Sequence, residues 1–341
     1  MKITLLGIDI AKTVFQLHGV DNYGKIVLRK KCSRGELLKT IANISPCLIG
    51  MESCGSSSYW AREFKKFGHE VKLISPQFVK PYVKSNKNDA ADAEAICEAV
   101  GRPNMRFVAI KPIESQDIQN LHRIRSRLVR SRTALSNEIR GLLGEYGLII
   151  PKGIGQMRKL LPKLLENAGD KLTSMSLECF YNLNRELSDI DEKILFYEIK
   201  LKAILKNSQI CQRIYTIPGV GPITATAVVS TVTDPFMFKN GRGLSAWLGL
   251  VPRQNSSGGK DQLLGISKLG DTYLRGLLIH GARTVLKNAG NKTDRQSIWV
   301  NKLAERRGKN RAAVALANKN ARAIWVLMTR NEEFKSFAAV A

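Results

Sequence analysis

Short apolar runs separated by polar turns fill the first third of the chain. Five of these runs have the length and residue types of strands, and they span residues 2–10, 14–20, 25–30, 47–51 and 70–74. Three intervening or following segments have helical spacing, and they span residues 35–44, 57–67 and 89–100. Asn88 or Asp89 is a suitable N-cap for the last helix. The pattern predicts a mixed sheet with flanking helices.

The order of these elements is informative about the fold class. Three strands joined by tight turns come first, and helices then alternate with strands. This is the element order of a ribonuclease-H-like (RuvC-like) domain, which we assign to residues 1–112. The remainder of the chain has helical patterns, so the predicted fold class is α/β plus α.

Long helices are predicted beyond Pro112. One helix over 118–146 has leucine and isoleucine on one side. A second segment has a heptad seam over three repeats, made of Leu183, Leu187, Ile190, Ile194, Tyr197, Leu201 and Ile204. The seam could pack back on the first helix as an antiparallel hairpin, or pair between subunits. Residues 113–208 are therefore predicted to be a helical, coiled-coil linker.

The last region, residues 209–341, is predicted to be mainly helical. Its segment 214–225 has the pattern helix, glycine turn, helix, and it resembles the helix-hairpin-helix that clamps DNA backbone. Gly219 and Gly221 would leave N–H groups free at a helix start, where the helix dipole favours a phosphate. The alternative is an ordinary turn between helices.

The charge of the chain narrows the class of partner. Lysine and arginine total 54 against 29 acidic residues, which gives a formal net charge of +25. Such a chain attracts polyanions in a salt-dependent way. Five arginines crowd the predicted helix 118–146 without an acidic neighbour in sequence, and we expect them to contact phosphates: Arg123, Arg125, Arg127, Arg130 and Arg132.

Membrane and disulfide classes are disfavoured. No apolar run reaches the roughly 18 residues of a membrane span, and no lipidation motif is present. The six cysteines never form a Cys-x-x-Cys pair, so neither a structural zinc site nor a disulfide framework is indicated. We expect a cytoplasmic, nucleoid-associated bacterial protein with no membrane partner.

Four acidic residues stand out in this basic chain. Asp9 and Glu52 each end an apolar run and each follow a Gly-x pair, while Asp89 and Asp92 lie three apart on one predicted helix face. Two-metal phosphoryl chemistry needs several carboxylates around cations about 3.5–4 Å apart. Oxygen ligands without soft donors favour Mg²⁺, or Mn²⁺. A sugar-kinase-like phosphate loop around Asp9 is a rival interpretation, but the glycine-rich phosphate and adenosine segments it requires are missing.

A polar loop near residue 256 offers a candidate nucleophile. Ser256 and Ser257 precede two glycines, and Arg253 and Lys260 flank them. A flexible connector would have the same composition. A serine that attacks a phosphodiester would nevertheless need this combination of backbone freedom and nearby cations.

Taken in order, six segments resemble the DEDD transposases of bacterial insertion sequences, a family that includes the bridge-RNA-guided serine recombinases. The matching segments are Gly7-Ile8-Asp9-Ile10-Ala11-Lys12, Glu52-Ser53-Cys54-Gly55, Asn88-Asp89-Ala90-Ala91-Asp92-Ala93, Ile217-Pro218-Gly219-Val220-Gly221, the serine loop, and Ile266-Ser267-Lys268-Leu269-Gly270-Asp271-Thr272-Tyr273-Leu274-Arg275. The resemblance spans nearly the whole chain.

The resemblance implies a RuvC-like domain, a coiled-coil linker and a second transposase domain that carries a serine. Its four acids fall on Asp9, Glu52, Asp89 and Asp92, and its serine falls on Ser257, with Ser256 as the fallback. It implies Mg²⁺-assisted attack on DNA, a phosphoserine intermediate and strand exchange.

The partners implied are donor and target DNA, a non-coding bridge RNA, and further copies of the chain in a dimer or tetramer, with acids and serine meeting across subunits. Lys268 and Arg275, in the last matching segment, are further candidates for nucleic-acid contact. Two alternatives stay open: a metal-dependent junction nuclease without serine chemistry, and a non-catalytic nucleic-acid-binding protein.

Overall fold

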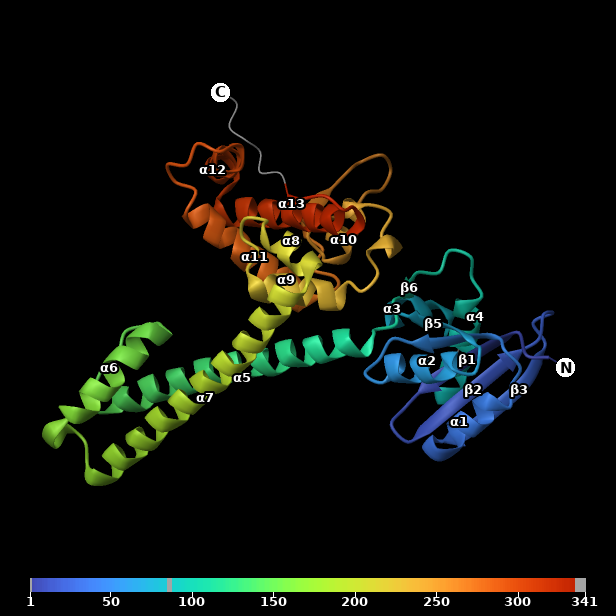
Figure 1. Cartoon of the computed structure of the whole chain (residues 1–341), viewed down its shortest axis with the longest axis horizontal. Helices are drawn as coiled ribbons and strands as arrows, with labels where there is room; N and C mark the ends of the chain where they lie inside the picture. Colours follow the sequence, from blue (N-terminus) through green and yellow to red (C-terminus); the bar gives the residue numbers. More distant parts are fainter. Residues whose placement is uncertain (1, 85–87, 335–341) are drawn as a thin grey trace. The chain divides into compact units, whose positions relative to one another are not determined.

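The computed structural model describes residues 2–84 and 88–334. The chain divides into two compact units, Met1–Ile113 and Glu114–Ala341. We describe each unit by itself (Figure 1). The three-part division predicted from the sequence remains a prediction.

The first unit is built on a mixed six-stranded sheet. Its strands are β1 (Leu5–Ile10), β2 (Val14–Val20), β3 (Ile26–Ser33), β4 (Leu48–Glu52), β5 (Glu70–Ile74) and β6 (Phe107–Val108). They lie in the order β3-β2-β1-β4-β5-β6. The β1–β4 and β4–β5 pairs are parallel, and the other three pairs are antiparallel. The five predicted strands are confirmed, and β6 is too short to have been recognised.

Helices cover both faces of this sheet: α1 (Arg34–Ala42), α2 (Ser57–Lys65), α3 (Pro76–Val79) and α4 (Asp89–Val100), with a 3₁₀ turn η1 (Lys80–Tyr82). Side chains of α1 and α2, such as Leu37 and Phe64, share one buried cluster with Leu6 and Ile8 of β1. Side chains of α3 and α4 form a separate cluster with Ile74 of β5. Because neighbouring strand residues point to opposite faces, the residues flanking Leu6 and Ile8 point toward α4.

The second unit begins with three helices that share one apolar cluster: α5 (Ile113–Glu145), α6 (Ile154–Glu166) and α7 (Ser174–Asn207). Leu187, Ile190 and Ile194 of the predicted seam are buried against Leu135 and Ile139 of α5. The seam therefore packs within the chain, which is the first of the two arrangements considered (Figure 1). The helix α6 had not been predicted.

The rest of the second unit is a helical domain with one small β-ribbon. Its elements are α8 (Gln209–Tyr215), α9 (Pro222–Thr231), α10 (Gly241–Trp247), β7 (Pro252–Gln254), β8 (Leu263–Ile266), α11 (Thr272–Lys287), α12 (Arg295–Arg307) and α13 (Lys309–Thr329), with 3₁₀ turns at Gly169–Lys171 and Pro235–Met237. The alanine-rich face of α13 lies in the core, where Ala313, Ala317 and Ala321 are fully buried. Small side chains let neighbouring helices approach α13 closely. In the described part of the chain, no helix is long and apolar enough to cross a membrane.

Candidate functional site

The acidic residues of the first unit lie at one edge of the sheet. Asp9 is in β1 and Glu52 is the last residue of β4. The two strands are parallel, with Ile8 opposite Met51, so the same register brings Asp9 beside Glu52. Both acids are half-buried.

A pair of glycines explains how α4 reaches these acids. Gly7 and Gly50 are direct partners in the β1–β4 register. A Cβ atom on Gly7 would lie 2.5 Å from the backbone nitrogen of Cys97 and still closer to the carbonyl oxygen of Ala93, both in α4. A Cβ atom on Gly50 would lie 2.7 Å from Cβ of Val100. The two glycines therefore form a flat patch on which α4 rests. Each glycine stands two residues before an acid on its strand, Asp9 on β1 and Glu52 on β4.

The start of α4 then completes an acidic cluster. Asn88 is its N-cap, and its Oδ1 accepts a hydrogen bond of 2.8 Å from the Ala91 N–H. Candidate ligand oxygens of Asp9, Asp89 and Asp92 all lie within 4.8 Å of one another. Glu52 is adjacent in register but does not belong to this group of described residues. The structure thus assembles three of the four predicted acids.

The donor set fits a hard divalent cation. Three carboxylates this close repel one another, and a cation removes that repulsion while satisfying their lone pairs. Asp89 is exposed and Asp9 and Asp92 are half-buried, so the cluster is open to a substrate. Sequence spacing had located Asp89 and Asp92, whereas the supporting role of Gly7 and Gly50 needed the strand register.

The serine loop is a paired ribbon. Strands β7 and β8 are antiparallel, and Ser257 forms a bridge with Lys260 across a two-residue turn. Gly258 and Gly259 both have positive φ, +55° and +76°, which is the geometry of a type I′ hairpin turn. The ribbon presents Ser257 at its exposed tip, with Lys260 opposite.

The two candidate serines differ in their contacts. The Ser256 hydroxyl accepts a hydrogen bond of 2.9 Å from the Gln254 side-chain amide. Among the described residues, none hydrogen-bonds to the Ser257 hydroxyl; its backbone carbonyl accepts from the Lys260 N–H at 3.0 Å. Of the two candidate serines, Ser257 therefore has the more accessible hydroxyl. Arg253 is exposed on the same ribbon.

The glycine turn between α8 and α9 packs closely on α11. Gly219 has φ +87°, and a Cβ atom there would lie 2.9 Å from the Gly281 carbonyl oxygen. Gly221 is the N-cap of α9 with an ordinary φ of −89°. A cavity of about 410 Å³ opens beside the turn, lined by Pro218, Gly219, Thr284, Val285, Asn288, Lys292, Asp294, Gln296 and Ser297. The turn thus borders a polar recess with one exposed lysine.

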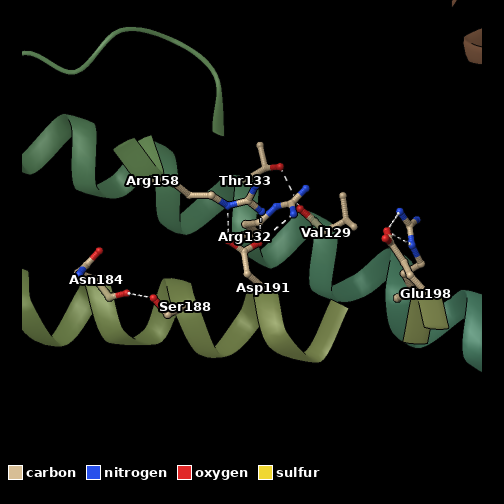
Figure 2. A network of polar contacts seen from close by, with 9 residues as sticks. Val129, Arg132, Thr133, Arg158, Asn184, Ser188, Asp191 and Glu198 are labelled. Atoms are coloured by element: carbon tan, nitrogen blue, oxygen red, sulfur yellow. Dashed lines mark hydrogen bonds and ion pairs between the residues drawn. The ribbon is translucent and has the colours of Figure 1, made fainter. Parts of the chain in front are cut away.

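The five arginines of α5 that were predicted to contact phosphates divide into two sets. Arg125 donates to Glu198 through Nε at 3.0 Å and Nη2 at 2.6 Å, and Arg132 donates to Asp191 at 2.9 Å. Arg158 of α6 also binds Asp191, so this carboxylate joins three helices (Figure 2). Burial disfavours the Asp191 carboxylate, but hydrogen bonds and charge from Arg158 and Arg132 prevail and lower its pKa. Two predicted phosphate ligands therefore have acidic partners on α7.

The other three of the five arginines predicted to contact phosphates are exposed: Arg123, Arg127 and Arg130. We call these the three exposed arginines. Lys268 is also exposed, with a positive φ of 56°. Arg275 differs, because its side chain is buried and donates to the carbonyl oxygens of Leu248 and Leu269. The Arg275 guanidinium thus holds the chain between α10 and α11, and its contact with nucleic acid stays a prediction from the sequence.

His122 of α5 lies at a buried polar junction that no sequence motif had indicated. Its Nε2 lies 3.1 Å from Oγ1 of Thr226, and its Nδ1 lies 3.1 Å from the hydroxyl of Tyr273. The Thr226 hydroxyl donates to the Pro222 carbonyl at 2.8 Å, so it accepts from Nε2–H, and Tyr273 donates to Nδ1. Burial, with a smaller effect of the Arg125 charge, lowers the pKa of His122 to about 4. The neutral imidazole thus joins α5 to α9 and α11.

Two family models and two relatives that match this chain are all described as transposases. A DEDD family model described as "Transposase" matches residues 6–148, and the model "Transposase IS116/IS110/IS902 family" matches residues 211–297. The "Transposase for insertion sequence element IS1111A" of Coxiella burnetii is 51% identical over 98% of this chain and 92% of its own. The "Transposase for insertion sequence element IS1328" of Yersinia enterocolitica is 41% identical over 97% of this chain and 98% of its own.

Proposed function

The chain belongs to the IS116/IS110/IS902 family of insertion-sequence transposases, and from this premise we propose that it recombines DNA through a serine nucleophile and a divalent cation. The observation that carries the proposal is the convergence of Asp9, Asp89 and Asp92 over the paired glycines. The mixed sheet and its strand order support assignment of the first unit to the ribonuclease-H-like class.

We assign the cation to Asp9, Asp89 and Asp92, with Glu52 close by, and infer Mg²⁺ or Mn²⁺ from the all-oxygen donor set. When bound, the cation would neutralise charge that develops on the phosphate and its attacking and leaving oxygens. The carboxylates would position it, with Asp9 and Asp92 half-buried and Asp89 exposed.

Ser257 is the proposed nucleophile. Its Oγ forms a bond to phosphorus as the bond from phosphorus to one deoxyribose oxygen breaks, and the serine proton ends on the released hydroxyl. Lys260 and Arg253 on the ribbon are suited to stabilise the phosphate charge. Because the phosphoserine keeps the energy of the broken diester, a second DNA hydroxyl can reverse the step and exchange strands.

The proposed partners are donor and target DNA and a non-coding bridge RNA from the element. The net charge of +25, the three exposed arginines, Lys268 and the recess beside Gly219 support binding to nucleic acid. We further propose a dimer or tetramer in which acids and serine of different subunits act together, in the bacterial cytoplasm at the nucleoid.

The test uses a plasmid that carries the complete element, with circle junctions measured by quantitative PCR. Ser257→Ala and Asp9→Ala should each abolish circle formation, whereas Ser256→Ala, the matched control on the same ribbon, should retain most of it. Co-expression of the two inactive variants should restore circles if different subunits supply the acids and the serine.

The chemistry itself is tested by trapping the intermediate. Wild-type protein mixed with junction DNA should give a denaturant-resistant adduct, and mass spectrometry should map the DNA to Ser257. DNA cleavage that survives Ser257→Ala but not Asp9→Ala would instead favour the junction nuclease. Circles formed without either residue would overturn both assignments.

A further inference from the structure

Helices α12 and α13 carry a basic surface that, apart from Arg295, lies beyond the segments matched by the family models, which end at residue 297. From residue 295 to 322 there is a single acid, Glu305, against eight basic residues: Arg295, Lys302, Arg306, Arg307, Lys309, Arg311, Lys319 and Arg322. Seven of these eight residues, all but Lys319, form no salt bridge with a carboxylate within the described chain. Seven of the eight are exposed, and Lys319 is half-buried.

An aromatic ring is set into this surface. Trp299 is 36% exposed. It shares one face of α12 with Lys302, Leu303 and Arg306, at spacings of three, four and seven residues, and the four side chains line a cavity of about 230 Å³. Nζ of Lys319, from α13, lies 4.9 Å from the centre of the Trp299 ring. The ring is therefore held in place by a cation and opens on a cavity with two more cations at its rim.

Two exposed cations, Lys302 and Arg306, lie at the rim of the cavity beside the ring. An anion bound there would contact both charges, and a flat ring on the indole would fill the apolar part of the cavity. Nucleotides combine these two properties, and base stacking on aromatic side chains is the common mode of binding to single strands.

We propose that Trp299, Lys302 and Arg306 form a binding site for single-stranded nucleic acid, in which an unpaired base stacks on the indole and the cations contact its phosphates. A duplex would not use the ring, because both faces of a paired base are already stacked. The proposal rests on the proposed function only in expecting a nucleic-acid substrate. It gives α12 a role in holding an unpaired strand of the RNA or the DNA.

The experiment measures fluorescence anisotropy with full-length protein in EDTA, so that no cleavage intervenes. The probes are labelled oligouridylate RNA, oligothymidylate DNA and a DNA duplex of mixed sequence, each about 12 nucleotides long, within the range of known single-strand sites. Trp299→Ala should weaken binding of at least one single strand about tenfold, the effect of losing one stacked base. Binding of the duplex should stay within about twofold of wild type, since duplex affinity rests on phosphate contacts.

Two controls separate stacking from general damage to α12. Ile298→Ala removes the neighbouring exposed apolar side chain, which does not line the cavity, and should bind like wild type. Trp299→Phe keeps a ring and should retain an intermediate affinity. Loss on RNA alone assigns the site to the guide strand, and loss on DNA alone assigns it to an unpaired DNA strand.

The proposal is overturned if Trp299→Ala binds both single strands as wild type does, or if Ile298→Ala loses as much affinity as Trp299→Ala. A loss confined to the duplex would overturn it as well. Because the assay needs neither metal nor Ser257, its result is independent of the recombination tests above.

Discussion

Replacing Gly7 by alanine should push α4 away from the sheet and open the acidic cluster. The added Cβ would lie 2.5 Å from the Cys97 nitrogen and 2.7 Å from the Cys97 Cβ, whereas ordinary contacts begin near 3.4 Å. The nitrogen belongs to the backbone of α4 and the Cβ is attached directly to that backbone, so neither can move without the helix. Helix α4 must therefore shift by about 1 Å.

The magnitude follows from that shift. Overpacking of this kind costs about 1–3 kcal/mol. Alanine returns about 0.4–1 kcal/mol by restricting the unfolded chain, since the φ of Gly7 is not in the left-handed region. The net loss is therefore between about 0 and 3 kcal/mol. A shift of about 1 Å is large against the ~0.2 Å tolerance of metal–ligand distances, so we expect metal affinity to fall on the order of 10-fold to 100-fold.

The assay is thermal unfolding in a titration with MnCl₂. Bound metal stabilises the wild type by RT ln(1 + [metal]/Kd), so the rise in Tm reports the affinity. For Gly7→Ala the rise should begin at 10-fold to 100-fold higher metal concentration. Gly35→Ala, in α1, is the matched control because a Cβ there meets only open space, and its titration should match that of the wild type.

If Gly7→Ala folds and binds metal at the wild-type concentration, the contact of α4 with Gly7 does not set the geometry of the acidic cluster. If that variant does not fold, Gly50→Ala provides the second test, since its Cβ meets only the Val100 side chain and the expected shift of α4 is smaller. A wild-type titration for Gly50→Ala would then show that contact with the paired glycines does not set the cluster.

Two further predictions concern the second unit. The pKa of about 4 for His122 in the folded protein lies below its unfolded value near 6.5, so the stabilisation by neutral His122 is complete above pH ~6.5 and is lost as the pH drops toward 4. In urea unfolding, we expect the free energy of unfolding to be about 2 kcal/mol lower at pH 5 than at pH 7, and to change much less in His122→Gln. Glutamine at the three exposed arginines should weaken nucleic-acid binding and flatten the slope of log K against log salt concentration by up to about 0.9 per phosphate contact. The double variant Arg125→Gln with Arg132→Gln should instead lower the free energy of unfolding and leave this slope unchanged. An unchanged slope in the first variant, or a flatter slope in the second, would contradict this division.

The local elements were predictable because their signals are local. Alternating apolar residues defined β2 and β5 at their observed bounds, and Asn88 before Asp89 marked the start of α4 correctly. The segments missed, β6 and α6, have weak local signals: β6 has two residues, and α6 contains Pro162. Their place depends on packing against other elements.

The roles of charged residues were less predictable. The sequence presents the arginines of α5 as one uniform set, yet α7 supplies Asp191 and Glu198 to two of them from some 60 to 70 positions away in the chain. The basic matching segment around Arg275 favours a contact with nucleic acid, but the side chain is buried and donates to backbone carbonyl groups. Charge along a chain does not report which side chains find partners.

The family-like motifs, the acidic residues, the serines and the attraction to polyanions can be found from the sequence alone, because these depend on residue type and short spacing. The folded structure was needed to show that Gly7 and Gly50 are register partners and that α4 rests on them, bringing Asp89 and Asp92 to Asp9. It also decided that Ser257, and not Ser256, has the hydroxyl without a partner among the described residues. The physical reason is that strand register and close packing join residues about 80 positions apart, and such contacts leave no periodic trace in the chain.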